Sequence, residues 1–181
     1  MGTISRLCHR NLLTWAKMSI VVIAVTATSI PAQAGEVITA STQKQLTCLA
    51  QNIYHEAGRE SLAGKVAVAQ VTINRANNGN FPSTICGVVN QKTQVADKTV
   101  CQFSWVCDPM AQSQRVYSEA WHESEAIARS VLLDGLRLET LGTKALYFHN
   151  ATVRPKWGLA RIDSIGGHVF YSNEKVKVAS K

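Results

Sequence analysis

The first 34 residues constrain the chain most strongly, because they determine where the rest of it folds. Three basic residues within positions 6–17 precede an uncharged apolar run over residues 18–30, and Pro31 and an Ala-Gln-Ala triplet follow. This order is typical of a secretory signal peptide. A membrane anchor is the alternative, but the run is well short of the roughly 20 residues that span a bilayer. We therefore expect a signal peptide at 1–34 and an exported domain at 35–181, in the periplasm or at the cell wall.

Composition then limits what the exported part can be. Its 181 − 34 = 147 residues are enough for one domain with a single core. With 46% hydrophobic residues, the chain is not expected to be disordered, collagen-like or a coiled coil. The exported part carries (19 − 3) − 12 = +4 charges, which suits an anionic polymer such as cell wall and does not indicate nucleic-acid binding. We expect a monomer with no membrane span after signal cleavage.

The cysteines add a second constraint. Cys8 lies in the predicted signal peptide, so Cys48, Cys86, Cys101 and Cys107 remain in a domain bound for an oxidising compartment. An even number there indicates two disulfides, for which three pairings are possible. We favour Cys101 with Cys107, as a short clip, and Cys48 with Cys86. A zinc site is the alternative, but the sequence has no CxxC pair, and we expect no metal and no other cofactor.

Hydrophobic periodicity predicts a mainly helical chain with a few short strands toward its C-terminal end. Residues 42–58 have apolar side chains at helical spacing, and Thr42 with Gln45 resembles a capping box at their start. Further helices are expected from residue 61 or 62 onward, over 84–90 and over 118–133. Short strands are expected over 102–105, 145–149 and 162–171, the last broken by Gly166-Gly167. Helices followed by strands favour an α+β domain.

The first predicted helix carries a candidate catalytic acid, Glu56. On a helical wheel, Glu56 lies at the edge of the apolar stripe beside Leu49, whereas His55 lies on the opposite, solvent-exposed side. A carboxyl at such a border loses hydration, which raises its pKa, as a general acid near neutral pH requires. The alternative is a salt bridge of Glu56 with Arg59 or Arg75. Zinc hydrolysis is not favoured, because Arg59 replaces the second histidine of H-E-x-x-H.

Aromatic and hydrogen-bonding side chains alternate near the C-terminal end of the chain. Three short segments between residues 147 and 171 combine them, and they include His149, Trp157 and His168. Sugars are bound by such combinations, with rings against C–H faces and polar groups against hydroxyls. The alternative is that these rings belong to the core. Trp157 follows a charged, proline-containing loop and has the best claim to an exposed role.

Several separated blocks of the sequence resemble the cell wall hydrolase family typified by the spore-cortex-lytic enzymes. They are NIYHEAGRES-LAGKVAVAQVTINRANNGNFPSTICGVV, CQFSWVCD, ALYFHN-ATVRPKW and IGGHVFY. The resemblance runs from about Cys48 to Tyr171. It implies a single domain similar to lysozyme and lytic transglycosylases that acts on peptidoglycan glycan strands. It also implies that the first glutamate of the Y-x-E-A-x-x-E block, Glu56, is catalytic. The other blocks suggest cleft roles for Gln102, Phe103, Ser104, His149 and His168. Glu60, one turn after Glu56, could share the cleft or pair with a basic residue.

The number of well-placed carboxylates bears on the mechanism. Ordinary glycosidases use two, whereas here only Glu56 has a positional argument, and Glu60, Asp108 and Asp163 are unsupported as a second. A single acid is sufficient if the substrate supplies the nucleophile, so we expect a lytic transglycosylase that leaves 1,6-anhydromuramic ends. Hydrolysis by water, as in a muramidase or glucosaminidase, is one alternative. A non-catalytic wall-binding module is another.

Overall fold

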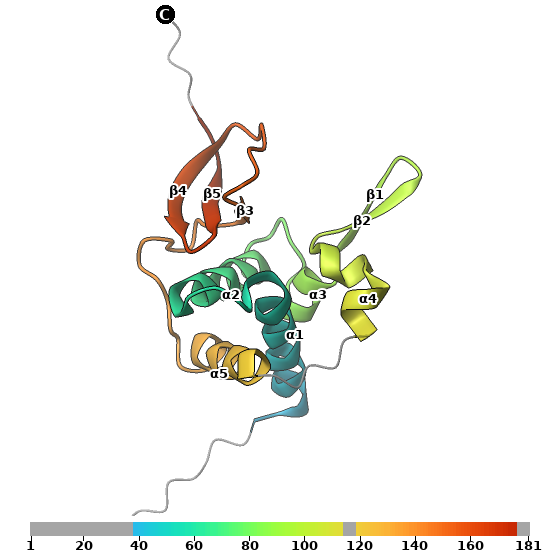
Figure 1. Ribbon diagram of the computed structural model, residues 1–181, viewed down its shortest axis with the longest axis vertical. Helices are drawn as coiled ribbons and strands as arrows, with labels where there is room; N and C mark the ends of the chain where they lie inside the picture. Colours follow the sequence, from blue (N-terminus) through green and yellow to red (C-terminus); the bar gives the residue numbers. More distant parts are fainter. Residues whose placement is uncertain (1–37, 114–118, 177–181) are drawn as a thin grey trace, which may run out of the picture. The chain divides into compact units, whose positions relative to one another are not determined.

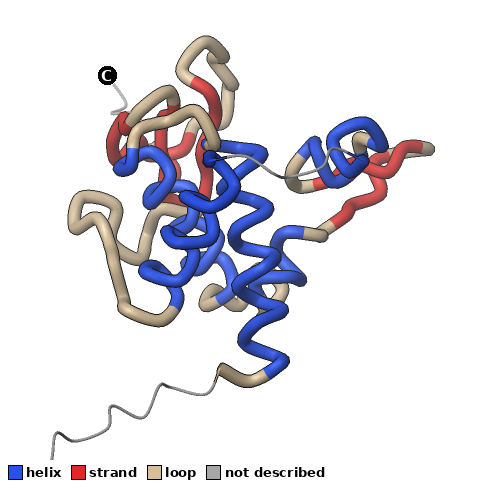
Figure 2. Tube along the Cα trace, turned by 60° about the horizontal axis from the view of Figure 1, so that its bottom comes forward, coloured by secondary structure: helices blue, strands red, loops and turns tan. Residues whose placement is uncertain are grey.

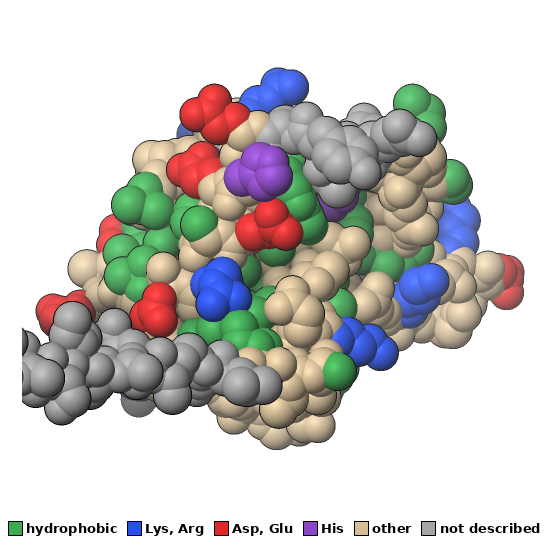
Figure 3. All heavy atoms as spheres, turned by 90° about the horizontal axis from the view of Figure 1, so that it is seen from below, with side chains coloured by type: hydrophobic (Ala, Val, Ile, Leu, Met, Phe, Trp, Pro, Cys, Tyr) green, Lys and Arg blue, Asp and Glu red, His purple; other side chains and the backbone are tan. Residues whose placement is uncertain are grey.

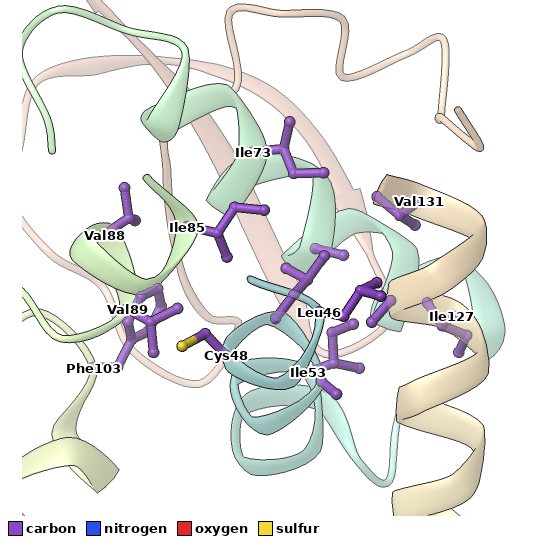
Figure 4. Close-up of a cluster of buried hydrophobic side chains, with 14 of the residues drawn as sticks. Leu46, Cys48, Ile53, Ile73, Ile85, Val88, Val89, Phe103, Ile127 and Val131 are labelled. Atoms are coloured by element: carbon purple, nitrogen blue, oxygen red, sulfur yellow. The ribbon is translucent and has the colours of Figure 1, made fainter. Parts of the chain in front are cut away.

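Helix α1 (Ala40–Ala57) packs against three other helices, α2 (Leu62–Ala76), α3 (Ile85–Val89) and α5 (Glu119–Leu132), as Figure 1 shows. The computed structural model describes residues 38–113 and 119–176, and the predicted signal peptide lies outside them. The apolar stripe expected on α1 is its buried face, since Leu46, Leu49 and Ile53 are at most 4% exposed. Figure 4 shows their neighbourhood, in which side chains from the four helices meet in one core.

Helix α2 is buried on every side, which explains why most of its residues are apolar or small and are not confined to one stripe. Every residue from Gly64 to Arg75 is buried. One part of the helix belongs to the core shared with α1 and α5. Ala67 and Val71 form a second cluster with Leu141, Ala145 and Phe170. The helix therefore connects the helical core to the sheet that follows it in the chain.

The helix boundaries agree with the sequence-based ranges to within two residues, but the expected cap of α1 is wrong. The helix begins at Ala40, and Thr39 is the N-cap, accepting a hydrogen bond from Thr42 N at 3.1 Å. Gln45 does not complete a capping box, because its Oε1 accepts from Cys86 N at 3.0 Å. Ser61 caps α2, and the helix expected from residue 61 or 62 onward is confirmed.

Residues 92–113 differ most from expectation. Strands β1 (Lys92–Val95) and β2 (Lys98–Cys101) form an antiparallel hairpin that extends from the helices in Figures 1 and 2. The strand expected over 102–105 is wrong, because η1 (Ser104–Cys107) is a 3₁₀-helix, followed by the short α4 (Pro109–Ser113). A disulfide holds the Cα atoms of Cys101 and Cys107 5.9 Å apart, whereas six residues of strand would span about 20 Å.

Both favoured disulfides are formed. Cys48 of α1 pairs with Cys86 of α3, with Cα atoms 5.2 Å apart, and Cys101 pairs with Cys107. The first bond links two helices of the core, and the second closes the segment after β2. All four cysteines of the described residues are therefore paired in disulfides.

The C-terminal part is a three-stranded antiparallel sheet. Its strands are β3 (Tyr147–Asn150), β4 (Leu159–Ile165) and β5 (His168–Lys175), in the order β3-β5-β4. The break expected at Gly166-Gly167 is the turn between β4 and β5, where Gly166 has a φ of +57°. The α+β class is confirmed. None of the helices in the described ranges is long and apolar enough to cross a membrane.

The surface carries charges of both signs. On the face in Figure 3, acidic, basic and histidine side chains are interspersed with apolar ones. Lys144 pairs with Glu174 of β5 at 3.1 Å, and Lys65 of α2 pairs with Glu123 of α5. An exposed pair such as Lys144–Glu174 contributes little to stability, at most about 1 kcal/mol.

Candidate active site

The C-terminal end of α1 borders two cavities, and both His55 and Glu56 line each of them. The first, of about 430 Å³, lies between α1, α2, residues 101–104 and the strands β3 and β5, and we call it the sheet-side cavity. The second, of about 380 Å³, is formed by the end of α1, the turn to Glu60 and Ala120 of α5, and we call it the helix-side cavity. Glu56 therefore lies where an extended ligand could pass from one cavity to the other.

Glu56 occupies the half-buried position that its place on the wheel predicted. Burial raises the pKa of its carboxyl to about 7, because desolvation disfavours the charged form. The positive charge of Arg75 acts in the opposite direction and lowers this pKa. Within the described ranges, no ion pair within 4.0 Å joins Glu56 to Arg59 or Arg75. Near neutral pH, the carboxyl can thus both hold and release a proton.

His55 is half-buried, and the expectation that it points into open solvent is wrong. Its ring stacks on Trp105 of η1, with centroids 4.4 Å apart and planes 16° apart. Trp105 donates from Nε1 to Asn52 Oδ1 at 3.2 Å, and Asn52 donates from Nδ2 to Thr72 Oγ1 at 3.0 Å. A wheel locates residues on their own helix only, and η1 covers the side that it left open. Burial also lowers the pKa of His55, so its ring is neutral at pH 7.

The sequence pattern did not single out Arg75 as a functional residue, yet it lies in the wall of the sheet-side cavity. Its side chain is buried, and Nε donates to Leu146 O at 2.7 Å. The guanidinium carbon lies 5.4, 5.5 and 5.9 Å from the ring centroids of Phe81, Phe103 and Tyr147. Burial lowers the pKa of Arg75 to about 10, so it remains charged at neutral pH. A basic residue near the end of a mostly apolar helix was the signal that could have identified it.

Glu60, which was expected in the cleft, has a structural role. Its Oε2 accepts a hydrogen bond from Gly167 N at 2.8 Å, in the turn between β4 and β5. A Cβ atom at Gly166 would overlap this carboxylate, and one at Gly167 would lie 2.6 Å from Oε1. The carboxylate thus fixes the turn that precedes His168. Glu60 also lines the helix-side cavity.

Two histidines from neighbouring strands line the sheet-side cavity, as expected. His149 Nδ1 lies 2.8 Å from the carbonyl oxygen of Asn150, so Nδ1 carries the proton and Nε2 accepts from the Tyr171 hydroxyl at 3.0 Å. His168 is 5% exposed, and its ring edge meets Phe148. Burial lowers the pKa of His168. Its Nδ1 has no hydrogen-bond partner among the described residues, so a bound ligand could satisfy it.

The segment after β2 places three expected residues in the sheet-side cavity. Gln102 and Ser104 are exposed, so their amide and hydroxyl groups can reach a ligand. Phe103 is 3% exposed and belongs to the core, where its ring lies 6.4 Å from that of Phe148. It is part of the cavity wall and offers no free stacking surface.

Trp157 is 39% exposed, as expected, but it lines neither cavity beside Glu56. It borders a separate hollow of about 270 Å³ with Tyr147 and Lys175. Its ring lies 5.4 Å from that of His149 in an edge-to-face arrangement. The indole therefore extends the surface of the sheet-side cavity through His149.

The remaining acidic candidates lie outside both cavities. Asp108 Oδ1 accepts from Met110 N at 2.9 Å at the start of α4, and Asp163 Oδ1 accepts from Ser164 N at 2.7 Å in β4. In the part of the chain that the structure describes, no group of three or more His, Cys, Asp or Glu side chains could hold a metal ion.

Known proteins resemble this chain in sequence and in fold. A family model described as Cell Wall Hydrolase matches residues 59–171, more than half of the chain. The spore cortex-lytic enzyme of Bacillus subtilis is 30% identical over 125 residues, which cover 67% of this chain and 35% of that protein. The enzyme of the same name from Oceanobacillus iheyensis is 30% identical over 131 residues, 71% of this chain and 41% of that protein. The chain thus spans less than half the length of these curated relatives.

A solved structure also resembles the fold. It is the catalytic domain of the germination-specific lytic transglycosylase SleB from Bacillus anthracis, with a TM-score of 0.54 and 27% identity. The likeness covers 75% of this chain and 100% of that domain. The predicted similarity to a lytic transglycosylase fold is therefore confirmed.

Proposed function

The chain belongs to the cell wall hydrolase family, and from this premise we propose that it cleaves peptidoglycan glycan strands with Glu56 as its single catalytic acid and base. The observation that carries the proposal is the environment of Glu56. Its carboxyl is half-buried between two cavities, and its pKa is raised to about 7 by the loss of hydration. A carboxylic acid that is protonated near neutral pH can donate to a glycosidic oxygen.

The other carboxylates near the site support a mechanism with one acid. Glu60, Asp108 and Asp163 each accept a hydrogen bond from a backbone N–H, at 2.8, 2.9 and 2.7 Å. These contacts hold the three side chains in the β4–β5 turn, at α4 and in β4. A second carboxylate that acts as nucleophile or base would have to face the sugar across from Glu56. We therefore assign the nucleophile to the substrate.

The reaction is a lytic transglycosylation. Protonated Glu56 donates its proton to the bridging oxygen as the bond between that oxygen and C1 of the muramic sugar breaks. The 6-hydroxyl of the same sugar bonds to C1, and the Glu56 carboxylate takes up the hydroxyl proton. The products are a 1,6-anhydromuramic end and a free hydroxyl on the leaving sugar. No water is consumed, and Glu56 returns to its protonated state.

Substrate contacts follow from the groups that the sheet-side cavity leaves available. The exposed Gln102 and Ser104 can hydrogen-bond to sugar hydroxyls or acetamido groups. The unpartnered Nδ1 of His168 and the ring of His149 lie along the same wall. Trp157, beside His149, gives a flat face against which a further sugar could stack. The glycan strand would then extend in the other direction into the helix-side cavity, past Glu60.

The wall substrate agrees with the signal peptide that we expect at residues 1–34, since the protein has to leave the cytoplasm to reach it. Plain hydrolysis is the alternative reaction, in which water replaces the 6-hydroxyl at the same site. Mass spectrometry of the released fragments distinguishes the two, because an anhydro end weighs one water less than a hydrolytic end.

The test of the proposed function is a comparison of three purified proteins on isolated peptidoglycan. We expect the parent protein to release soluble muropeptides, and Glu56→Gln to reduce the rate by at least about 100-fold, because Gln cannot donate the proton. Glu139→Gln is the matched control, because Glu139 is exposed and lines neither cavity, and it should act at the parent rate. Undiminished release by a folded Glu56→Gln protein would refute the assignment. Binding without release by the parent would indicate a wall-binding module.

A further inference from the structure

Arg75 combines a fixed position with an unsatisfied group. The side chain is 3% exposed and is held by the hydrogen bond from Nε to Leu146 O. The three rings of Phe81, Phe103 and Tyr147 surround the guanidinium at 5.4 to 5.9 Å. Its Nη1 atom, however, is buried without a hydrogen-bond partner among the described residues.

An arginine in this state is costly to bury. Aromatic faces compensate part of the lost hydration. A buried guanidinium with an unpaired nitrogen is still strongly stabilised by a negative charge nearby. Glu56 can supply this negative charge when it is ionised, because its side chain and that of Arg75 line the same cavity. The absence of an ion pair within 4.0 Å between these two described residues means that the interaction acts through space, not through a shared hydrogen bond.

We propose that Arg75 is a positioning residue whose fixed positive charge stabilises the Glu56 carboxylate formed when the proton leaves, and so sets the acid strength of Glu56. This inference rests on the proposed function of Glu56. Burial alone makes the carboxyl a weak acid, which would hold its proton too tightly to donate it. A direct ion pair would have the opposite fault, because it would keep Glu56 ionised. The positive charge of Arg75 in the same cavity, without a direct ion pair, gives Glu56 an intermediate acid strength. Glu56 can then act first as an acid and afterwards as a base.

Other titratable groups also face Glu56, and they need to be separated from Arg75. On its own helix and the following turn they are Tyr54, His55, Arg59 and Glu60, and on the strands β3 and β5 they are His149 and His168. Ala120 of α5 and residues 101–104 contribute no ionisable side chain to the cavities. All of these groups stay unchanged when only position 75 is substituted. A change in the titration of Glu56 then reports the charge at position 75.

The experiment compares Arg75→Gln with Arg75→Lys in the purified protein. The carboxyl of Glu56 is followed by carbon-13 NMR, and its signal is assigned by its loss in Glu56→Gln. We expect Arg75→Gln to raise the pKa of Glu56 by about one unit or more, because a nearby opposite charge lowers a carboxyl pKa by about 1 to 3 units. The alkaline limb of kcat/KM should move upward in pH by the same amount, with a lower plateau. Arg75→Lys keeps the charge and should stay within about half a unit of the parent.

A second measurement needs no substitution of Arg75 and therefore cannot fail through misfolding. The Nε–H signal of Arg75 in the parent protein should change with pH at the midpoint of the Glu56 titration, and it should lose that transition in Glu56→Gln. The proposal is overturned if this transition is absent in the parent, or if folded Arg75→Gln leaves the Glu56 midpoint unchanged. Both NMR readouts are independent of turnover. A failure of the catalytic assignment, seen as an active Glu56→Gln, is therefore distinguishable from a failure of this inference.

Discussion

Among single residues, Glu56 differs from the neighbouring carboxylates in the way that its charge is compensated. Glu60, Asp108 and Asp163 each accept a hydrogen bond from a backbone N–H. The pKa of Glu56 is instead governed by burial and by the charge of Arg75. A wheel predicted the border position, because helical periodicity alone determines it. The wheel could not predict that Arg75 lines the same cavity as Glu56, since this depends on how α2 packs against α1.

The raised pKa of Glu56 predicts how stability depends on pH. The carboxyl titrates at about 7 in the folded protein, whereas its ordinary pKa, expected in the unfolded chain, is 4.5. Between these pH values the folded state binds more protons than the unfolded state. The free energy of unfolding therefore falls as pH rises from 4.5 to 7. Glu56→Gln removes this loss and should stabilise the protein at pH 8 by on the order of 3 kcal/mol, with little change at pH 4.

Urea unfolding of the parent and of Glu56→Gln at pH 4 and pH 8 measures this difference. Glu139→Gln provides the control, because Glu139 is exposed and its substitution should not change the pH dependence. An equal effect of Glu56→Gln at both pH values would mean that the folded protein does not raise the pKa of Glu56.

Among the elements, the β4–β5 hairpin is joined to the turn between α1 and α2 by the Glu60 carboxylate. It receives the Gly167 N–H and leaves no room for a Cβ at Gly166. The sequence indicated a turn at these glycines, because turns favour them. It could not indicate that Glu60 reaches this turn, since 107 residues separate Glu60 from Gly167. The strand expected over 102–105 failed for a similar reason, because the Cys101–Cys107 disulfide prevents an extended segment.

Two glycine substitutions test the contact between Glu60 and the hairpin. Gly166 has a φ of +57° and faces Glu60, whereas Gly158 has a φ of +61° and has no atom within 4 Å of a built Cβ. We expect Gly158→Ala to cost about 1 to 2 kcal/mol through backbone strain. Gly166→Ala should cost about 1 to 3 kcal/mol more, because it also displaces a hydrogen-bonded carboxylate. Urea unfolding compares the two, and equal losses would show that the Glu60 contact contributes nothing.

At the scale of the whole molecule, the environment of Glu56 is assembled from parts that are distant in sequence. The acid comes from α1 and the compensating charge from α2, while residues 101–104 and the strands β3 and β5 complete the sheet-side cavity. Periodicity predicted the helices and the α+β class, because it reports burial along one element at a time. It placed His55 in solvent, because the stacking of His55 on Trp105 is a contact between elements.

The pKa of Glu56 therefore reports whether this assembly is correct, and it is the most direct test of a single catalytic acid. It is measured as the midpoint of the Glu56 carboxyl signal in a carbon-13 NMR titration of the folded parent protein. A midpoint near 7 is the predicted result. A midpoint near the ordinary glutamate value of 4.5 would contradict it, because Glu56 would then be ionised at neutral pH and would have no proton to donate.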